Sequence, residues 1–234
     1  MLERIYTIPI NEAFDACAQD SANGCPFCRL QSMLEQNEIE IILGGAMMEP
    51  DVRIKTNAQG FCLRHYKAML EKNNMLGVGL MLESHLDELR AQLEPGGIAV
   101  LAKGGPAPVA IERLQRLDGS CYICGRVNFS LGRMLSNAAM LWDTEKEFRD
   151  KTAAQPYFCL KHFRMWCEEA KKYMNKKRFP EFYDAVSKVM LAYFDSLRAD
   201  VSQFCRQFDY RYEGEPLGNT KDAVERAIKF LRGV

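Results

Sequence analysis

The sequence predicts an all-α fold made of two tandem, internally duplicated helical units. Three observations lead to this prediction. Apolar residues recur at spacings of three and four over long stretches, as they do on one face of an α-helix. The alternation of apolar and polar residues that marks a half-buried strand is scarce. A set of cysteine and histidine motifs occurs twice in the same order, and 234 residues allow two domain-sized copies.

Each copy is expected to contain four helices in the same order: a long one, a short polar one, one that begins at a cysteine, and a long amphipathic one. In the first copy the last helix carries Leu82, Leu86 and Leu89 on one stripe. In the second copy it starts near Pro180, which suits a first helical turn. The expected ranges are 28–47, 51–58, 62–72 and 75–93, and then 125–142, 144–153, 159–175 and 180–208.

The repeat also predicts the domain organisation. A first helical unit is expected at 1–94 and a second at 111–208. The stretch 95–110 between them is rich in glycine and proline, as linkers are. It lacks the Gly-Lys-Ser/Thr ending of a phosphate-binding loop. A tail with one short helix is expected at 209–234.

Composition indicates in which compartment the protein is expected and which partners are disfavoured. Lysine plus arginine equals aspartate plus glutamate at 31 each, so the net charge disfavours nucleic acid as a partner. No apolar run reaches the roughly 20 residues of a membrane span, and the N-terminal residues lack the apolar run of a signal peptide. We therefore expect a cytoplasmic protein, where thiols stay reduced. Its nine cysteines then indicate metal binding rather than disulfides.

Eight of the cysteine and histidine residues form four paired motifs. Two are CxxC motifs and two are CxxH motifs, and nearly the same spacing separates CxxC from CxxH in each half. We group each CxxC with the CxxH that follows it, so that each half contains one Cys₃His site. The expected sites are Cys25/Cys28/Cys62/His65 and Cys121/Cys124/Cys159/His162.

Two Zn²⁺ ions per chain are the expected cofactors. Three thiolates and one imidazole can complete a zinc tetrahedron. A CxxH motif in the first turn of a helix places both side chains on one face, and the helix N-terminus favours the thiolate. Basic residues lie near the motifs in both halves, at Arg29, Arg64, Arg126 and Lys161. Iron or an iron–sulfur cluster is the alternative.

Three cysteines remain outside the motifs. Cys17 and Cys205 are expected to pack as small buried apolar residues. Cys167 follows His162 by five residues, about 500° of helical rotation, so it should point away from the metal and be buried too.

The motifs CPFCRL, GFCLRH, CYICGR and FCLKHF, together with YTIPINEAF and FDYRYEGEP, resemble an uncharacterised bacterial cytosolic family, a domain of unknown function with paired CPxC…GFCxxH and CxxC…FCxxH motifs. The resemblance covers essentially the whole chain. It implies a soluble bacterial protein with paired Cys/His sites, and it implies no activity.

Three functions remain open. The first is a zinc-organised scaffold or interaction module with structural metals and an unknown protein or small-molecule partner. The second is an iron–sulfur or thiol redox protein. The third is an enzyme with a site near residues 47–57, where a possible ligand-contacting surface is formed by Glu49, Asp51, Arg53 and Asn57. His85 is mid-helix and is expected to be hydrogen-bonded or exposed.

Overall fold

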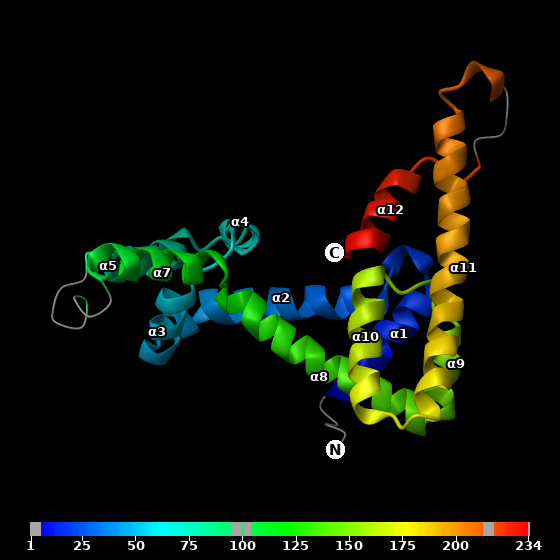
Figure 1. Ribbon diagram of the computed structural model, residues 1–234, viewed down its shortest axis with the longest axis horizontal. Coiled ribbons are helices and arrows are strands. Elements are labelled where there is room, and N and C mark those ends of the chain that lie inside the picture. The colour runs from blue at the N-terminus through cyan, green and yellow to red at the C-terminus, as the bar shows by residue number, and fades with distance from the viewer. Residues whose placement is uncertain (1–5, 95–99, 101–103, 213–217, 234) are drawn as a thin grey trace. The chain divides into compact units, whose positions relative to one another are not determined.

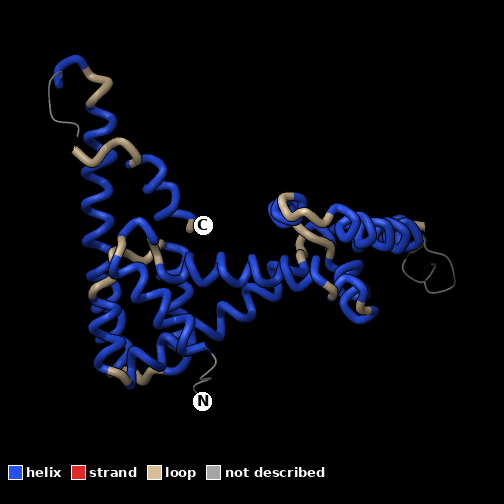
Figure 2. Tube along the Cα trace, turned by 180° about the vertical axis from the view of Figure 1, so that it is seen from behind, coloured by secondary structure: helices blue, strands red, loops and turns tan. Residues whose placement is uncertain are grey.

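The described part of the chain is entirely helical or loop. The computed structural model describes residues 6–94, 100, 104–212 and 218–233. In these ranges the regular elements are α-helices and short 3-10 helices, with no strand (Figures 1 and 2). The all-α prediction is therefore confirmed. None of the described helices is both long and apolar enough to cross a membrane.

Two long helices follow the CxxC motifs. They are α2, Pro26–Gly44, and α8, Tyr122–Thr144. The chain separates into two compact units whose boundaries fall inside these helices. The first unit contains Met1–Ser32 and Ser130–Val234, and the second contains Met33–Phe129. These units differ from the expected tandem halves 1–94 and 111–208, because each long helix begins in one unit and ends in the other.

The first unit is built on an aromatic core. Helices α10 and α12 pack against α11, and α1 packs against α9 (Figure 1). The core rings contact one another edge-on or tilted, with Phe27 and Trp166 centroids 4.9 Å apart. The remaining elements of this unit are α1 (Thr7–Gln19), η2 (Ser21–Asn23), α9 (Lys146–Ala153), α10 (Leu160–Tyr173), α11 (Arg178–Arg206), η4 (Tyr210–Tyr212) and α12 (Ala223–Arg232).

The second unit has an aliphatic core. Its elements, besides the ends of α2 and α8, are η3 (Ala46–Met48), α3 (Pro50–Gln59), α4 (Leu63–Leu70), α5 (Met75–Leu93) and α7 (Pro106–Asp118). Helices α3 and α7 both pack against α5. Asn74 caps α5 by accepting a hydrogen bond from the Gly77 amide at 2.9 Å.

The buried face of α5 contains only part of the expected leucine stripe. Val78, Met81 and His85 are buried and Leu82 packs against the core, whereas Leu86 is 60% exposed. The stripe of Leu82, Leu86 and Leu89 is offset by about one residue from this face, which is about 100° on a helix. Both stripes are largely apolar, so periodicity alone could not decide between them.

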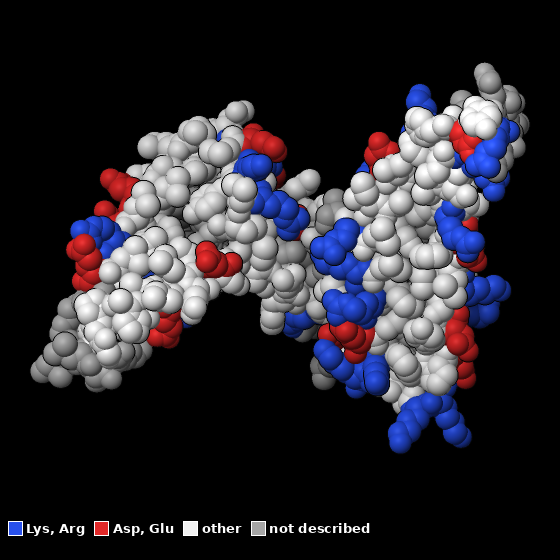
Figure 3. Space-filling view, turned by 45° about the horizontal axis from the view of Figure 1, so that its top comes forward, with Lys and Arg blue, Asp and Glu red and all other residues white. Residues whose placement is uncertain are grey.

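The helix order expected for each copy is observed, with small shifts at the ends. The sequence pattern missed α7, which begins at Pro106 inside the expected linker 95–110. The rest of that linker, apart from Val100, Gly104 and Gly105, lies outside the described residues, as does 213–217 of the tail. The short tail helix is present as α12. Acidic and basic side chains are found on both units, in keeping with the balanced charge (Figure 3).

Candidate metal centres

The eight motif residues lie in two groups of four. Within each group the potential ligand atoms all lie within 4.8 Å of one another. The first-unit cluster consists of Cys25, Cys28, Cys159 and His162. The second-unit cluster consists of Cys62, His65, Cys121 and Cys124.

This grouping corrects the expected one. Each cluster combines the CxxC motif of one sequence half with the CxxH motif of the other, so Cys25/Cys28/Cys62/His65 and Cys121/Cys124/Cys159/His162 are not the sites. The physical reason is the length of the helix that follows each CxxC motif. Helix α2 has 19 residues, which makes it roughly 28 Å long. It therefore separates Cys28 from the CxxH motif that comes next in the chain.

The first turns of two helices, α2 and α10, carry the four ligands of the first-unit cluster. Pro26 is the first residue of α2, where proline is favoured, and Cys25 and Cys28 flank this first turn. Cys159 is the N-cap of α10, and His162 follows in its first turn. Residues three apart lie on the same face of a helix. The sequence thus places two ligands at each of two helix starts.

The distances in the first-unit cluster match a tetrahedral site. The Nδ1 atom of His162 lies 3.3 Å from the Cys28 Sγ, 3.2 Å from the Cys159 Sγ and 4.0 Å from the Cys25 Sγ. The Cys28 and Cys159 sulfurs are 3.6 Å apart. Ordinary zinc bond lengths place two thiolates about 3.8 Å apart and a thiolate about 3.6 Å from an imidazole nitrogen. The distances differ from these values by at most about 0.4 Å, so the residues fit a Zn²⁺ ion.

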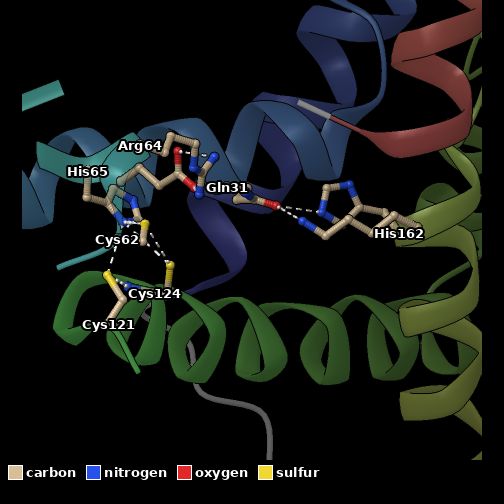
Figure 4. A network of polar contacts seen from close by, with 9 residues as sticks. Gln31, Cys62, Arg64, His65, Cys121, Cys124 and His162 are labelled. Carbon is tan, nitrogen blue, oxygen red and sulfur yellow. Dashed lines mark hydrogen bonds and ion pairs between the residues drawn. The ribbon is translucent and has the colours of Figure 1, made fainter. Parts of the chain in front are cut away.

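Gln31 orients the His162 ring. Its Oε1 lies 2.8 Å from Lys161 Nζ and 3.1 Å from His162 Nε2 (Figure 4). Because an ammonium group only donates, the amide oxygen must face this side. The same oxygen then accepts from Nε2–H, which leaves the Nδ1 lone pair facing the three sulfurs. A hydrogen bond of this kind orients a histidine for metal binding.

Gln31 was missed from the sequence, although it lies three residues after Cys28 on the same face of α2. The residue three after Cys124 is Val127. Accordingly, His65 Nε2 in the second-unit cluster is buried without a hydrogen-bond partner among the described residues. The two clusters therefore have the same types of ligand, three cysteines and one histidine. They differ in whether a side chain accepts a hydrogen bond from the histidine ring.

This difference gives a first prediction. Changing Gln31→Leu should weaken metal binding at the first-unit cluster by roughly 10- to 100-fold, because the Nε2–H loses its acceptor. Gln31→Glu keeps an acceptor oxygen and should retain the metal at least as well. Competition with a chromophoric chelator measures both affinities. Equal affinity in the Leu and Glu variants would show that this hydrogen bond does not tune the site.

Burial alone does not favour three thiolates at the first-unit cluster. All four residues are buried. Desolvation raises the pKa of Cys25 well above its usual range, while hydrogen bonds from Cys25 and Cys28 lower the pKa of Cys159. A thiolate at Cys159 also suits its place at the N-terminus of α10. A bound cation is what would favour ionisation of the other two thiols.

Gly233, which follows α12, lies against the first-unit cluster. Gly233 has φ +75°, and a Cβ built on it would lie 3.4 Å from Cys159 Sγ and 3.8 Å from Cys28 Sγ. Glycine suits this position because its backbone is left-handed and because it approaches the sulfurs closely. Phe230 of α12 is buried beside Tyr157 and Tyr193 and so anchors this segment.

The second-unit cluster is also tetrahedral in arrangement. His65 Nδ1 lies 3.2 Å from Cys62 Sγ, 3.3 Å from Cys121 Sγ and 3.4 Å from Cys124 Sγ (Figure 4). The Cys62 and Cys124 sulfurs are 3.9 Å apart. Cys62 is the N-cap of α4, just as Cys159 is the N-cap of α10. Nδ1 is therefore the nitrogen presented to the sulfurs in both clusters.

The second-unit cluster is less enclosed than the first. Cys62 and Cys124 are partly exposed. Burial acts to raise the pKa of the Cys62 thiol, but a hydrogen bond from the His65 backbone N–H and contacts with Cys121 and Cys124 lower it overall. Burial raises the pKa of Cys124 to about 12. Burial and the neighbouring Arg64 lower the pKa of His65, which favours the neutral ring that a metal ligand requires.

Ion pairs surround the second-unit cluster. Arg64 interacts with Cys124 and also forms a 2.6 Å ion pair with Glu35. Arg126 donates to Glu38 at 2.5 Å, which links α8 to α2. The expectation of basic residues beside the thiols is therefore met by Arg64 here and by Lys161 at the first-unit cluster. Exposed ion pairs contribute little to stability, so their main effect is on local charge.

Hydrogen bonds connect the two segments that carry the ligands of the second-unit cluster. The Tyr122 amide donates to the Gly60 carbonyl at 3.0 Å, and the Ser120 hydroxyl donates to the Gln59 carbonyl at 2.7 Å. Gly60 has φ +61°, and a Cβ there would lie 2.8 Å from a Leu117 methyl group. These contacts bring Cys62 and Cys121 together from distant parts of the sequence.

The three other cysteines lie outside both clusters. Cys17 is buried as expected, and Cys167 is half-buried, with its pKa raised to about 12 by burial. Cys205 is exposed, so the expectation of burial was wrong for it. It follows the buried Leu197 by eight residues, which turns it about 80° away from that face.

The four proposed ligand-contacting residues differ in their surroundings. Arg53 donates to the Leu80 carbonyl, and Asn57 exchanges hydrogen bonds with Ser84 at 3.1 and 3.3 Å. Both therefore help pack α3 against α5. Glu49 and Asp51 are exposed at the start of α3. His85 is buried and its Nδ1 lies 2.9 Å from the Asn57 carbonyl, so it is hydrogen-bonded as expected.

Comparison with protein-family models matches residues 1–234 to a family described as "Family of unknown function (DUF6062)". The match covers the whole chain, as the resemblance of its motifs predicted. Searches of the curated proteins and of the solved structures gave no match.

Proposed function

We propose that this chain, which belongs to the DUF6062 family of unknown function, binds two structural Zn²⁺ ions that organise a helical scaffold for interaction with a partner. The observation that carries this proposal is the presence of two groups of three sulfurs and one imidazole nitrogen at tetrahedral spacing. Cysteine and histidine in this ratio are a common ligand set of structural zinc.

The ligand number favours a structural role for the metals. Catalytic zinc usually keeps one position open for water or substrate, whereas structural zinc is held by four protein ligands. Each cluster offers four. Zinc would supply a Lewis-acid charge that stabilises thiolates, and the residues of this chain would hold it: three sulfurs and the Nδ1 atom of one histidine.

The metals would act as cross-links between the two sequence halves. Cys28 and Cys159 are 131 positions apart, and Cys62 and Cys124 are 62 apart. The unfolded chain does not hold these ligands together, so each ion would bind the folded chain preferentially and stabilise it through its binding free energy. The metals would thereby fix which helix starts meet, and leave the outer helix faces available to a protein or small-molecule partner.

Metal analysis of protein purified without added metal tests the identity of the ions. We expect about two zinc per chain and no visible absorption, because Zn²⁺ has a filled d shell. The Cys205→Ser variant is the matched control, since Cys205 is exposed and outside both clusters, and it should keep both ions. Coloured protein containing iron and sulfide would instead establish the iron–sulfur alternative.

A further inference from the structure

The second unit contains a cavity of about 630 Å³ that neither cluster occupies. It lies among α3, α5, α7 and the residues that lead into α8. This volume is within the range of small-molecule sites in proteins. Its polar lining consists of Gln59, Gln92, Arg113, Arg116 and Ser120, and Ala58 and Val109 add an apolar wall.

Arg113 is a buried cation whose hydrogen-bond partners are all neutral. Only 5% of this residue is exposed. Its Nε donates to the Gln92 side-chain oxygen, and its Nη2 donates to the Asn57 carbonyl at 3.0 Å. Among the described residues no carboxylate forms an ion pair with it. Gln92 in turn donates its side-chain amide to the Glu88 carboxylate at 2.8 Å.

Such an arginine is suited to bind an anion. A buried charge is costly unless an opposite charge or hydrogen bonds compensate it. The guanidinium has five N–H donors, and the two hydrogen bonds above use only part of them. A phosphate or carboxylate group matches the planar, forked donor geometry of arginine.

A second cation faces the same cavity. Arg116 lines it from α7 and has no ion pair within the described ranges of the chain. Arg113 and Arg116 are three residues apart, so they lie on the same side of α7. Two arginines with neutral polar neighbours form an electropositive pocket, and the apolar wall at Ala58 and Val109 favours an organic group on the anion.

We propose that this cavity binds a small organic anion through its phosphate or carboxylate group, with Arg113 and Arg116 as the charged contacts. Arg113 holds the group from the cavity wall, Arg116 contacts it from the more open side, and the organic part packs against Ala58 and Val109. This site is independent of which metal fills the clusters.

Calorimetric titration of the metal-loaded full chain tests this proposal. Phenyl phosphate, benzoate and inorganic phosphate are the probes, in a phosphate-free buffer with chloride at matched ionic strength. We expect saturable binding of at least one probe. Arg116→Gln should weaken that binding by about tenfold or more, because a charge-assisted hydrogen bond to the anion is lost. Arg113→Gln should abolish it.

The control is Arg164→Gln. Arg164 is exposed on α10, pairs with Glu168 in the first unit, and should leave binding unchanged. Arg113→Gln could unfold the second unit, since Arg113 bonds to α3 and α5. Arg116→Gln is therefore the variant that tests the anion site, because the Arg116 side chain forms no hydrogen bond with any described residue. Absence of saturable binding by all three probes, or binding that Arg116→Gln leaves intact, would overturn the proposal.

Discussion

Replacing Cys28 and Cys159 together should remove one metal ion per chain, whereas replacing Cys28 and Cys62 together should remove both. In the structure Cys28 and Cys159 belong to the same cluster, with sulfurs 3.6 Å apart. Cys62 belongs to the other cluster. Loss of one thiolate from a four-ligand site leaves three ligands, which is the coordination of a site open to water and to chelators.

Metal analysis of the two double serine variants measures this difference directly. The single variants Cys28→Ser and Cys124→Ser should each lose about one ion and serve as references, and Cys205→Ser should lose none. Circular dichroism verifies that each variant stays helical. If the Cys28/Cys62 variant kept one ion and the Cys28/Cys159 variant kept none, the clusters would instead be grouped within the sequence halves.

Removing both metals should lower the melting temperature by roughly 10 °C or more. Structural zinc contributes on the order of 10–16 kcal/mol of apparent binding energy in small finger peptides, and a chain with its own core depends on it less. A loss of about 5 kcal/mol corresponds to a shift of roughly 10–20 °C in a chain of this size. The measurement is thermal unfolding followed by circular dichroism, with and without a strong chelator.

The two metals should leave at different rates. The second-unit cluster should release its ion at least tenfold faster, because Cys62 and Cys124 are partly exposed and no described residue forms a hydrogen bond with Nε2 of its histidine. The first-unit cluster is buried beneath Gly233.

Each rate can be followed separately in a variant that keeps one site. Cys28→Ser retains the second-unit cluster, and Cys124→Ser retains the first. Release to a chromophoric chelator gives the two rates. Equal rates, or faster release from the Cys124→Ser protein, would contradict the link between enclosure and metal retention. An unchanged melting temperature after complete removal would contradict a structural role.

The sequence by itself determined the all-α fold and the eight side chains of the candidate sites. Both follow from local rules. Apolar residues at spacings of three and four specify helices, and a cysteine at a helix N-cap with a histidine three residues later specifies two ligands on one face. These rules place Cys62 with His65 and Cys159 with His162 regardless of the rest of the chain.

Only the tertiary structure decided how those ligands pair. Two CxxC and two CxxH motifs of the same local geometry can be grouped in two ways, and spacing along the chain does not distinguish them. Helix α2 carries the chain roughly 24 Å away from Cys28, but a segment that turned back along it could still have brought the next CxxH motif to Cys28. Instead the Tyr122 amide donates to the Gly60 carbonyl, so this CxxH motif meets the CxxC motif of the other half through a contact between segments far apart in the sequence.

Packing also decided the details around each cluster. Leu86 is exposed because the face of α5 that packs against α3 is offset from it by about one residue. Cys205 is exposed because it lies about 80° from the buried face of α11. Gln31 becomes a histidine partner only because a CxxH motif from the other half reaches it. Periodicity specifies which residues share a helix face, but the neighbour that covers that face comes from elsewhere in the chain, and contacts between distant segments determine it.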